Sequence, residues 1–156
     1  MVNESCIFCQ IAQGTAPCHK IWSSDTHLAF LTIFPNTPGF SVVIPRQHLD
    51  SYAFAQDDQV LTDLTLATKR VALLLDKYYD DVSRCGMFFE GWGVDHLHSK
   101  LFPMHGTGGE SAWLNIESSE PTFYETYPGF LPSNNGPRAD DTELAKLAAA
   151  IRNTVK

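Results

Sequence analysis

The sequence lacks the features of membrane proteins, secreted proteins and proteins that hold long nucleic acids. No stretch approaches the roughly 18 apolar residues of a membrane span, and the N-terminal stretch MVNESCIFCQIAQG has no basic flank of the kind that begins a signal peptide. Lys and Arg number 11 against 18 Asp and Glu, which gives a formal net charge of −7, and there is no basic run. Long nucleic acids bind mainly through Lys and Arg. We therefore expect a cytoplasmic protein that binds neither a membrane nor a long nucleic acid.

Cysteine is also scarce. Four cysteines in a cytoplasmic protein are more often free thiols or metal ligands than disulfides. The chain has 156 residues, 44% hydrophobic and 19% charged, which is ordinary for one globular domain with a real core. There is no internal repeat and no low-complexity tract, so the motifs must indicate the function.

Hydrophobic periodicity and turn residues predict an α+β fold. Residues 56–79 carry apolar side chains at three- and four-residue steps, which is typical of a long helix packed on a sheet. We expect strands at 19–22, 27–33, 41–44, 85–90 and 96–104, a short helix at 5–13 with Ser5 as its N-cap, and a final helix at 141–153. We expect a domain over residues 1–106 and a C-terminal extension over 107–156 packed on the same domain. Its stretch 107–139, rich in proline and aromatics, should fold over the body or onto a partner subunit.

The most unusual stretch is His96-Leu97-His98-Ser99-Lys100. In a strand, alternate side chains share one face, so His96, His98 and Lys100 would project together. Imidazoles and an ammonium are poor core residues. Spaced about 6.6 Å apart along a strand, they suit a polyanion such as a phosphate chain. The pattern predicts a cleft lined by these side chains; the alternative is two surface histidines that happen to lie two residues apart.

Four separated motifs together resemble the histidine triad (HIT) superfamily of nucleotide hydrolases and transferases. They are the C-x-F-C start, the segment AFLTIFPNTPGFSVVIPRQH, the long helix, and H-x-H-x-K before Pro103 in place of the usual H-x-H-x-H. The resemblance covers about residues 6–105. It implies a HIT-like fold with a five-stranded antiparallel sheet, a long packed helix and a short N-terminal helix, and usually a homodimer.

The resemblance also implies an activity. It assigns attack on the α-phosphate of a nucleotide conjugate or dinucleoside polyphosphate to His98, through a covalent nucleotidyl-histidine that water then hydrolyses. Neutral imidazole is a good nucleophile near pH 7, and Lys100 can stabilise negative charge on the phosphate. Two other interpretations stay open: a nucleotide-binding or regulatory module with little activity, and a zinc-stabilised interaction domain.

The substrate contacts that the resemblance implies are altered in this chain. Thr32 stands where the family has the Asp that holds the ribose hydroxyls, and Phe40 replaces a histidine. Gly91, Trp92 and Gly93 occupy the loop that brings backbone amides and a polar side chain to the phosphates. Thr32 can still form a hydrogen bond, the glycine amides can still bind phosphate, and Trp92 can either stack on a base or pack.

The N-terminal C-x-x-C spacing lets two thiolates share a metal ion, and a closed zinc site needs two more ligands. Neutral imidazole is the usual complement to thiolate, and the sequence offers six histidines. His19 is one candidate. The resemblance instead selects His48 and His96, and so implies one structural zinc ion held by Cys6, Cys9, His48 and His96. Such an ion would orient the strand that carries the nucleophile.

The remaining polar candidates are expected to be structural. Cys18 and Cys85 are interpreted as idle thiols, and His27 as a strand-surface residue. Arg138 is expected to form a surface salt bridge rather than reach a phosphate. His105 follows the fifth strand and is a weak candidate for the cleft.

Overall fold

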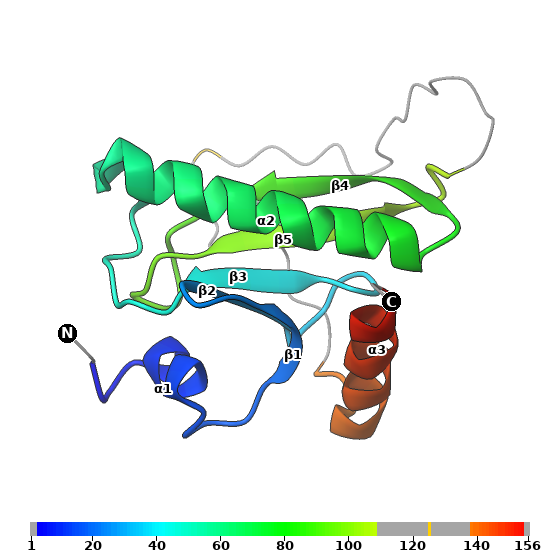
Figure 1. Ribbon diagram of the computed structural model, residues 1–156, viewed down its shortest axis with the longest axis horizontal. Helices are drawn as coiled ribbons and strands as arrows, with labels where there is room; N and C mark the ends of the chain where they lie inside the picture. The colour runs from blue at the N-terminus through cyan, green and yellow to red at the C-terminus, as the bar shows by residue number, and fades with distance from the viewer. Residues whose placement is uncertain (1–2, 109–124, 126–137, 155–156) are drawn as a thin grey trace.

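A computed structural model describes residues 3–108, 125 and 138–154. Within these residues the chain forms α1 (Ile7–Gln13), β1 (His19–Ser23), β2 (His27–Leu31), β3 (Ser41–Pro45), a 3-10 helix η1 (Ala53–Ala55), α2 (Asp58–Tyr78), β4 (Val82–Phe88), β5 (Ser99–His105) and α3 (Asp141–Asn153) (Figure 1). The expectation for residues 107–139 falls largely outside the described residues. None of the described helices combines the length and the apolarity of a membrane span.

The five strands form one antiparallel sheet in the order β1-β2-β3-β5-β4. This order places β5 inside the sheet, where Ser99 pairs with Val43 of β3 and Lys100 with Phe88 of β4. The residues that lead into β5 therefore lie near the middle of the sheet. The α+β class and the five-stranded antiparallel sheet expected from the sequence are confirmed.

Helix α2 covers one face of the sheet and builds the larger core with it (Figure 1). Its residues Leu64, Val71 and Leu75 are fully buried, as the hydrophobic periodicity predicts. Thr68 lies on the same side of the helix, and its hydroxyl lies 2.6 Å from the hydroxyl of Ser99. Full burial of a large apolar side chain stabilises a fold by about 1.5–3 kcal/mol. Helix α2 therefore anchors the start of β5 through Thr68.

The opposite face carries a smaller cluster covered by α1. Ile11 of α1 and Phe30, Val42 and Ile44 of the sheet belong to this cluster, whereas Val43 belongs to the larger core. This division follows from the alternation of side chains along a strand. The two faces of the sheet thus have separate layers, which we call the α2 face and the α1 face.

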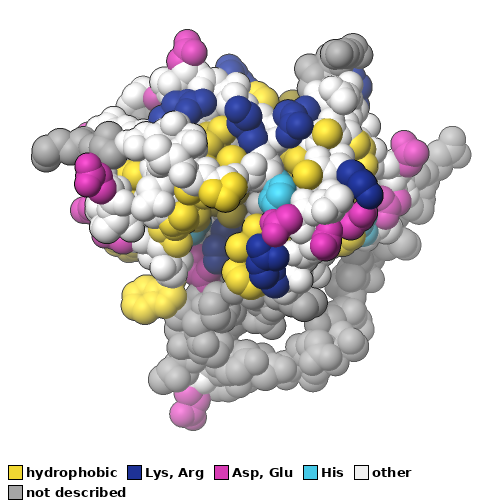
Figure 2. All heavy atoms as spheres, turned by 90° about the horizontal axis from the view of Figure 1, so that it is seen from below, with side chains coloured by type: hydrophobic (Ala, Val, Ile, Leu, Met, Phe, Trp, Pro, Cys, Tyr) yellow, Lys and Arg dark blue, Asp and Glu magenta, His cyan; other side chains and the backbone are white. Residues whose placement is uncertain are grey.

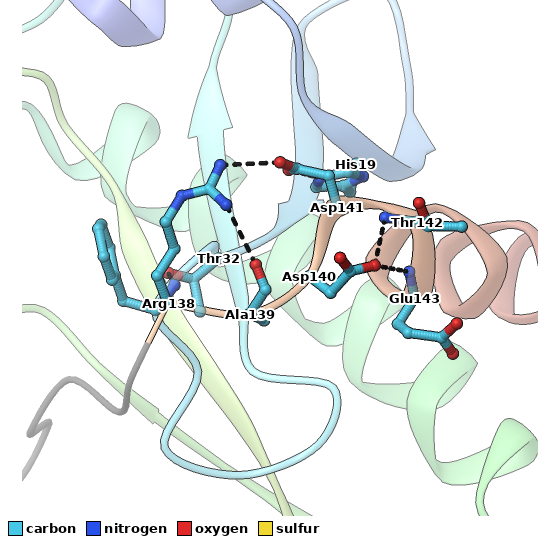
Figure 3. A network of polar contacts seen from close by, with 9 residues as sticks. His19, Thr32, Arg138, Ala139, Asp140, Asp141, Thr142 and Glu143 are labelled. Carbon is cyan, nitrogen blue, oxygen red and sulfur yellow. Dashed lines mark hydrogen bonds and ion pairs between the residues drawn. The ribbon is translucent and has the colours of Figure 1, made fainter.

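The last described helix, α3, has a well-formed N-cap. Asp140 is the N-cap of α3, and its carboxylate accepts hydrogen bonds from the backbone N–H groups of Thr142 and Glu143 at 2.9 and 3.1 Å (Figure 3). This helix lies against β1 (Figure 1) and adds to the larger core Leu144, Ala148 and Ile151. The helix and its cap agree with the sequence prediction, while the division of the chain at residue 106 stays a prediction.

The predicted start of β5 is wrong. The strand begins at Ser99 and not at His96, because the preceding N–H groups form hydrogen bonds outside the sheet. The N–H of His96 binds the carbonyl of Val94 at 2.9 Å, and that of Leu97 binds the carbonyl of Leu49 at 2.8 Å. His96 and His98 therefore lie on the segment that enters the strand.

The predicted start of α1 is also slightly wrong. Its N-cap position is Cys6 and not Ser5. The Ser5 hydroxyl binds the side-chain oxygen of Asn3 at 2.7 Å, so it is used in the preceding turn. At the other end, Gly14 stops the helix as expected, with a φ of 79° that favours glycine.

Candidate active site and metal centre

Four side chains from separate segments bring their ligand atoms together at the start of α1. These atoms all lie within 4.8 Å of one another, and they belong to Cys6, Cys9, His48 and His96. The Sγ of Cys6 lies 3.5 Å from Nδ1 of His96, and the Sγ of Cys9 lies 3.3 Å from Nδ1 of His48. Sulfur and nitrogen ligands of one tetrahedral zinc ion lie about 3.6 Å apart, given the usual bond lengths. The cluster can therefore hold one metal ion, and it contains the four residues expected from the sequence.

The ring of His96 is oriented toward the thiols by a backbone hydrogen bond. Its Nε2 lies 2.9 Å from the carbonyl oxygen of Pro45. A carbonyl only accepts, so Nε2 carries the hydrogen and Nδ1 presents its lone pair to the sulfur atoms. Bonds of this kind fix the tautomer of metal-binding histidines. Burial lowers the pKa of His96 and raises the pKa of the Cys9 thiol, and a bound cation would oppose the second effect because thiolate is the ligand form.

His98 has the tautomer that a nucleophile needs. Its Nδ1 lies 2.7 Å from the carbonyl oxygen of His96, so Nδ1 carries the hydrogen and the lone pair lies on Nε2. Burial lowers the pKa of this imidazole, and the nearby charge of Lys100 lowers it further, while the bond to His96 and the charge of Glu90 oppose these effects. The ring is therefore neutral near pH 7.

The sequence pattern predicts a cleft lined by His96, His98 and Lys100, whereas the rings of both histidines are buried. His96 is 0% exposed and His98 is 2% exposed. Part of their cover comes from Phe8 of α1, whose ring contacts His96 and His98 edge-on at centroid distances of 5.8 and 5.5 Å. The alternation of side chains predicts that these rings share one face. It contains no information on how α1 lies over them.

Lys100 and Glu90 form an ion pair that is largely shielded from water. The Lys100 ammonium donates to Oε2 of Glu90, and the two side chains are 14% and 7% exposed. Lys100 is on β5, two residues after His98, and Glu90 lies just beyond β4, whose Phe88 pairs with Lys100. The ammonium also lies 5.8 Å from the centre of the Phe88 ring. The side chain that replaces the third histidine of the family motif is thus already paired with a carboxylate.

The Phe88 ring beside this ion pair belongs to a cluster of aromatic side chains. The Phe40 ring stacks on Phe102 at 6.3 Å, and Phe88 lies 5.7 Å from Phe102. The close approach of Phe102 to β4 requires Gly86, since a Cβ at that position would lie 2.2 Å from the ring. On the face of the molecule drawn in Figure 2, hydrophobic side chains gather with charged side chains of both signs around them. Phe40, which replaces a histidine of the family pattern, therefore packs in an apolar cluster.

The loop after β4 places two glycines and an exposed tryptophan beside the segment before η1. Gly91 and Gly93 have φ angles of 64° and 90°, which favour glycine. The Ser51 hydroxyl donates to the carbonyl of Gly91 at 3.0 Å. Trp92 is 67% exposed, so its ring does not pack in the core of the described chain, and its role as a base contact stays a prediction.

Thr32 lies next to Phe40 in the backbone pairing beyond the end of β2. It follows β2, and its backbone N–H binds the carbonyl of Phe40 at 3.1 Å. Its hydroxyl accepts from the N–H of Phe34 at 3.2 Å. Next to it, the N–H of Ala139 binds the carbonyl of Ile33 at 2.9 Å, so Thr32 lies beside the segment that leads into α3 (Figure 3). Its role as a ribose contact stays a prediction.

Several other candidates have structural partners. Arg138 pairs with Asp141 at 2.8 Å, which confirms the expected surface salt bridge, and His19 lies 2.9 Å from the same carboxylate (Figure 3). His19 is therefore not in the metal cluster. The Nδ1 of His105 lies 3.1 Å from a carboxylate oxygen of Asp81, and its Nε2 lies 3.0 Å from the carbonyl of Pro38. His27 was expected at the surface and is instead buried.

The comparison with protein families decides the identity of the fold. Residues 13–106 match the HIT domain. The chain belongs to the HIT family. An adenosine 5′-monophosphoramidase of Schizosaccharomyces pombe is 32% identical to this HIT protein over 99 residues, which are 64% of this chain and 74% of that protein. A HIT-like protein of Mycoplasma genitalium is 30% identical over 138 residues, 85% of this chain and 96% of that one.

Solved structures agree with the fold of this HIT protein. A Zn-bound histidine triad family protein from Mycobacterium smegmatis superposes with a TM-score of 0.68 at 18% identity, covering 97% of this chain and 93% of that chain. A hypothetical histidine triad nucleotide-binding protein from Sulfolobus tokodaii gives 0.69 at 19% identity, covering 96% and 91%. At such identities the likeness shows the shared fold.

Two residues of the site were missed in the sequence. Glu90 ends the stretch Met87-Phe88-Phe89-Glu90, where a carboxylate after three apolar residues was a usable signal. Alternation places Glu90 on the same face as Phe88, and Phe88 is the partner of Lys100. Phe8 stands in the C-x-F-C motif, but its contact with His98 had no sequence signal because it depends on how α1 packs.

Proposed function

We propose that this HIT protein hydrolyses a nucleotide conjugate, or transfers its nucleotidyl group, through a covalent bond between phosphorus and His98. The observation that carries the proposal is the hydrogen bond from Nδ1 of His98 to the carbonyl of His96, which leaves the Nε2 lone pair for attack. A lowered pKa keeps this ring neutral. The adenosine 5′-monophosphoramidase among the relatives supports a nucleoside phosphoramidate as one substrate.

The proposed reaction has two displacements at the α-phosphorus. In the first, Nε2 of His98 attacks phosphorus, and the bond to the leaving group breaks as the P–N bond forms. The leaving group departs with the electron pair of the broken bond and takes up a proton. In the second, water attacks phosphorus, the P–N bond breaks, and a nucleoside monophosphate leaves while the water gives up a proton. Lys100 stabilises negative charge on the phosphate.

Access to His98 requires a local movement. With 2% of its surface exposed, the imidazole meets a phosphate only if part of its cover is displaced. We infer that the Phe8 ring, which lies edge-on against it, shifts when a nucleotide enters. Thr32, Gly91, Trp92 and Gly93 remain proposed substrate contacts.

We propose that the ion at the cluster is zinc. Two thiols and two imidazoles are a donor set that zinc prefers, and their spacing fits a tetrahedral site. A closed four-ligand zinc site supplies a structural cross-link. His96 would link α1 to the segment before β5, and its carbonyl at the same time holds Nδ1 of His98. A homodimer and a cytoplasmic location stay predictions.

The second candidate is a nucleotide-binding or regulatory module without rapid chemistry. The near-complete burial of His98 favours it, since a covered nucleophile is slow to react. The replacement of family residues by Thr32 and Phe40 favours it as well. Turnover, compared with binding, separates the two candidates.

The test is hydrolysis of adenosine 5′-phosphoramidate by the parent protein, His98→Ala and a control, His19→Ala, whose ring lies 2.9 Å from Asp141 outside the site. We expect turnover by the parent and the control, and a loss of about 10⁴-fold or more in His98→Ala, as for other removed nucleophiles. Calorimetry with AMP on the same samples reports binding. Binding without turnover in the parent would establish the module, and full activity in His98→Ala would exclude the covalent mechanism.

A further inference from the structure

Glu90 has no part in the family resemblance, yet it touches the side chain beside the proposed nucleophile. Its carboxylate accepts a hydrogen bond from the ammonium of Lys100, and both side chains are largely shielded from solvent. Charged groups this far from water keep their full charge only when they are paired. The carboxylate of Glu90 therefore offsets charge on the ammonium of Lys100.

Lys100 follows His98 by two residues, and both lie on the α1 face: Phe8 of α1 contacts the His98 ring, and Lys100 pairs with Val42 of the cluster covered by α1. The charges of Lys100 and Glu90 therefore lie on the same face as the imidazole. The Phe88 ring lies 5.8 Å from the ammonium, and the two charged side chains are 14% and 7% exposed, so water screens these charges poorly. Interactions between charges strengthen as the surrounding dielectric constant falls. The charges of both Glu90 and Lys100 would therefore act on a phosphate bound at His98.

We propose that Glu90 determines substrate specificity: by neutralising Lys100 beside His98, it favours nucleotides whose leaving group carries little negative charge, such as an amine, over nucleotides whose leaving group is a polyphosphate. The inference rests on the proposed function. A phosphoramidate releases a neutral amine, so it brings one negative charge, that of the α-phosphate. A dinucleoside polyphosphate keeps several negative charges on its leaving group, and Lys100 attracts these charges less because Glu90 offsets its own charge.

This role predicts how the ratio of kcat/KM for the phosphoramidate to kcat/KM for the polyphosphate changes when Glu90 is replaced. A carboxylate that only supports the fold would, when removed, lower the activity toward both substrates by the same factor. A carboxylate that sets the charge of the site changes the ratio of the two kcat/KM values. Replacing Lys100 should then move the ratio in the opposite direction, and removing both charges should restore it.

The experiment measures kcat/KM for adenosine 5′-phosphoramidate and for diadenosine tetraphosphate at one ionic strength. The variants are Glu90→Gln, Lys100→Met and the double variant. The control is Glu143→Gln, which makes the same change of net charge at an exposed pair with Lys146. If Glu90→Gln does not fold, Glu90→Ser serves as the neutral variant.

We expect Glu90→Gln to shift the ratio about tenfold or more toward the polyphosphate, and Lys100→Met to shift it the other way. The double variant should return to within about threefold of the parent ratio, and Glu143→Gln should stay within about twofold, since exposed charges are screened. An unchanged ratio in the neutral Glu90 variant, with turnover still dependent on His98, overturns the role of Glu90 alone. Turnover of neither substrate by the parent overturns the proposed function itself.

Discussion

The two faces of the sheet bury different kinds of residues. On the α2 face the buried side chains are mostly apolar, and α2 and α3 supply them to a single core. On the α1 face the buried or half-buried groups include thiols, imidazoles and an ion pair beside a small apolar cluster. Burial of polar groups costs free energy unless each has a partner. The polar groups buried on the α1 face therefore lower the free energy of unfolding, whereas the apolar core of the α2 face raises it.

The polar groups of the α1 face have partners that orient them. His96 binds the carbonyl of Pro45, His98 binds the carbonyl of His96, and Lys100 binds Glu90. The first two bonds leave the lone pairs of the two rings on opposite nitrogens, Nδ1 for the thiols and Nε2 for a substrate. Adjacent imidazoles thereby take different roles. The comparison predicts that changes on the α1 face alter the metal or the chemistry, and changes on the α2 face alter stability alone.

The largest effect is expected when the metal cluster is broken. Cys9→Ser removes one thiolate, so the protein should lose its zinc and about 4 kcal/mol or more of its free energy of unfolding, because metal binding contributes directly to folding. Elemental analysis and calorimetry measure the two losses. Cys18→Ser is the matched control outside the cluster. A metal-free parent, purified without chelator, or unchanged metal content in Cys9→Ser would contradict the assignment.

A cavity on the α2 face should affect stability without affecting the chemistry. Leu64→Ala, at a fully buried position, should lower the free energy of unfolding by about 3 kcal/mol, while kcat/KM of the folded protein stays within about twofold of the parent. Leu66→Ala on the same helix is the control, since Leu66 is exposed. Denaturant unfolding and turnover measure the two quantities. A large loss of kcat/KM in folded Leu64→Ala would break the division between the faces.

The smallest effect concerns a polar residue on the α2 face. His27 is buried, and burial lowers its pKa below the ordinary value of 6.5, although Asp63 opposes this. Below pH 6.5 the unfolded chain takes up a proton that the folded protein refuses, so stability falls as the pH falls. One such group contributes at most about 1.4 kcal/mol per pH unit.

We therefore expect thermal stability to decline from pH 7 to pH 5, and to decline less steeply in His27→Gln. Thermal unfolding at several pH values measures the slope. Equal slopes for the parent and the variant would show that His27 does not contribute, and would leave the α2 face without a titrating group of this kind.

Much of the fold could be predicted from the sequence because periodicity and turns are local signals. The helical steps of α2, the stop at Gly14 and the cap at Asp140 needed only neighbouring residues. The start of β5 could not be predicted, because His96 and Leu97 form backbone bonds with Val94 and Leu49. The second of these partners is distant in sequence.

The site could be predicted in part for the same reason. The C-x-x-C pair and the two motif histidines are visible in the sequence, and the resemblance supplied His48. The burial of His98 could not be predicted, because it depends on Phe8 of α1 packing against the segment that precedes β5. Likewise, Lys100 was expected to contact the phosphate of a substrate. Its contact with Glu90 could not be predicted, because it depends on the register between β4 and β5.

The most direct test of the account is to trap the covalent intermediate. The protein would be mixed with excess adenosine 5′-phosphoramidate, quenched during turnover under alkaline conditions that preserve a P–N bond, and analysed by peptide mass spectrometry. The account predicts an adenylyl group on the peptide of His98, localised to that residue and absent in His98→Ala. Turnover with no adduct at His98, or an adduct on His96 or Lys100 instead, would contradict it.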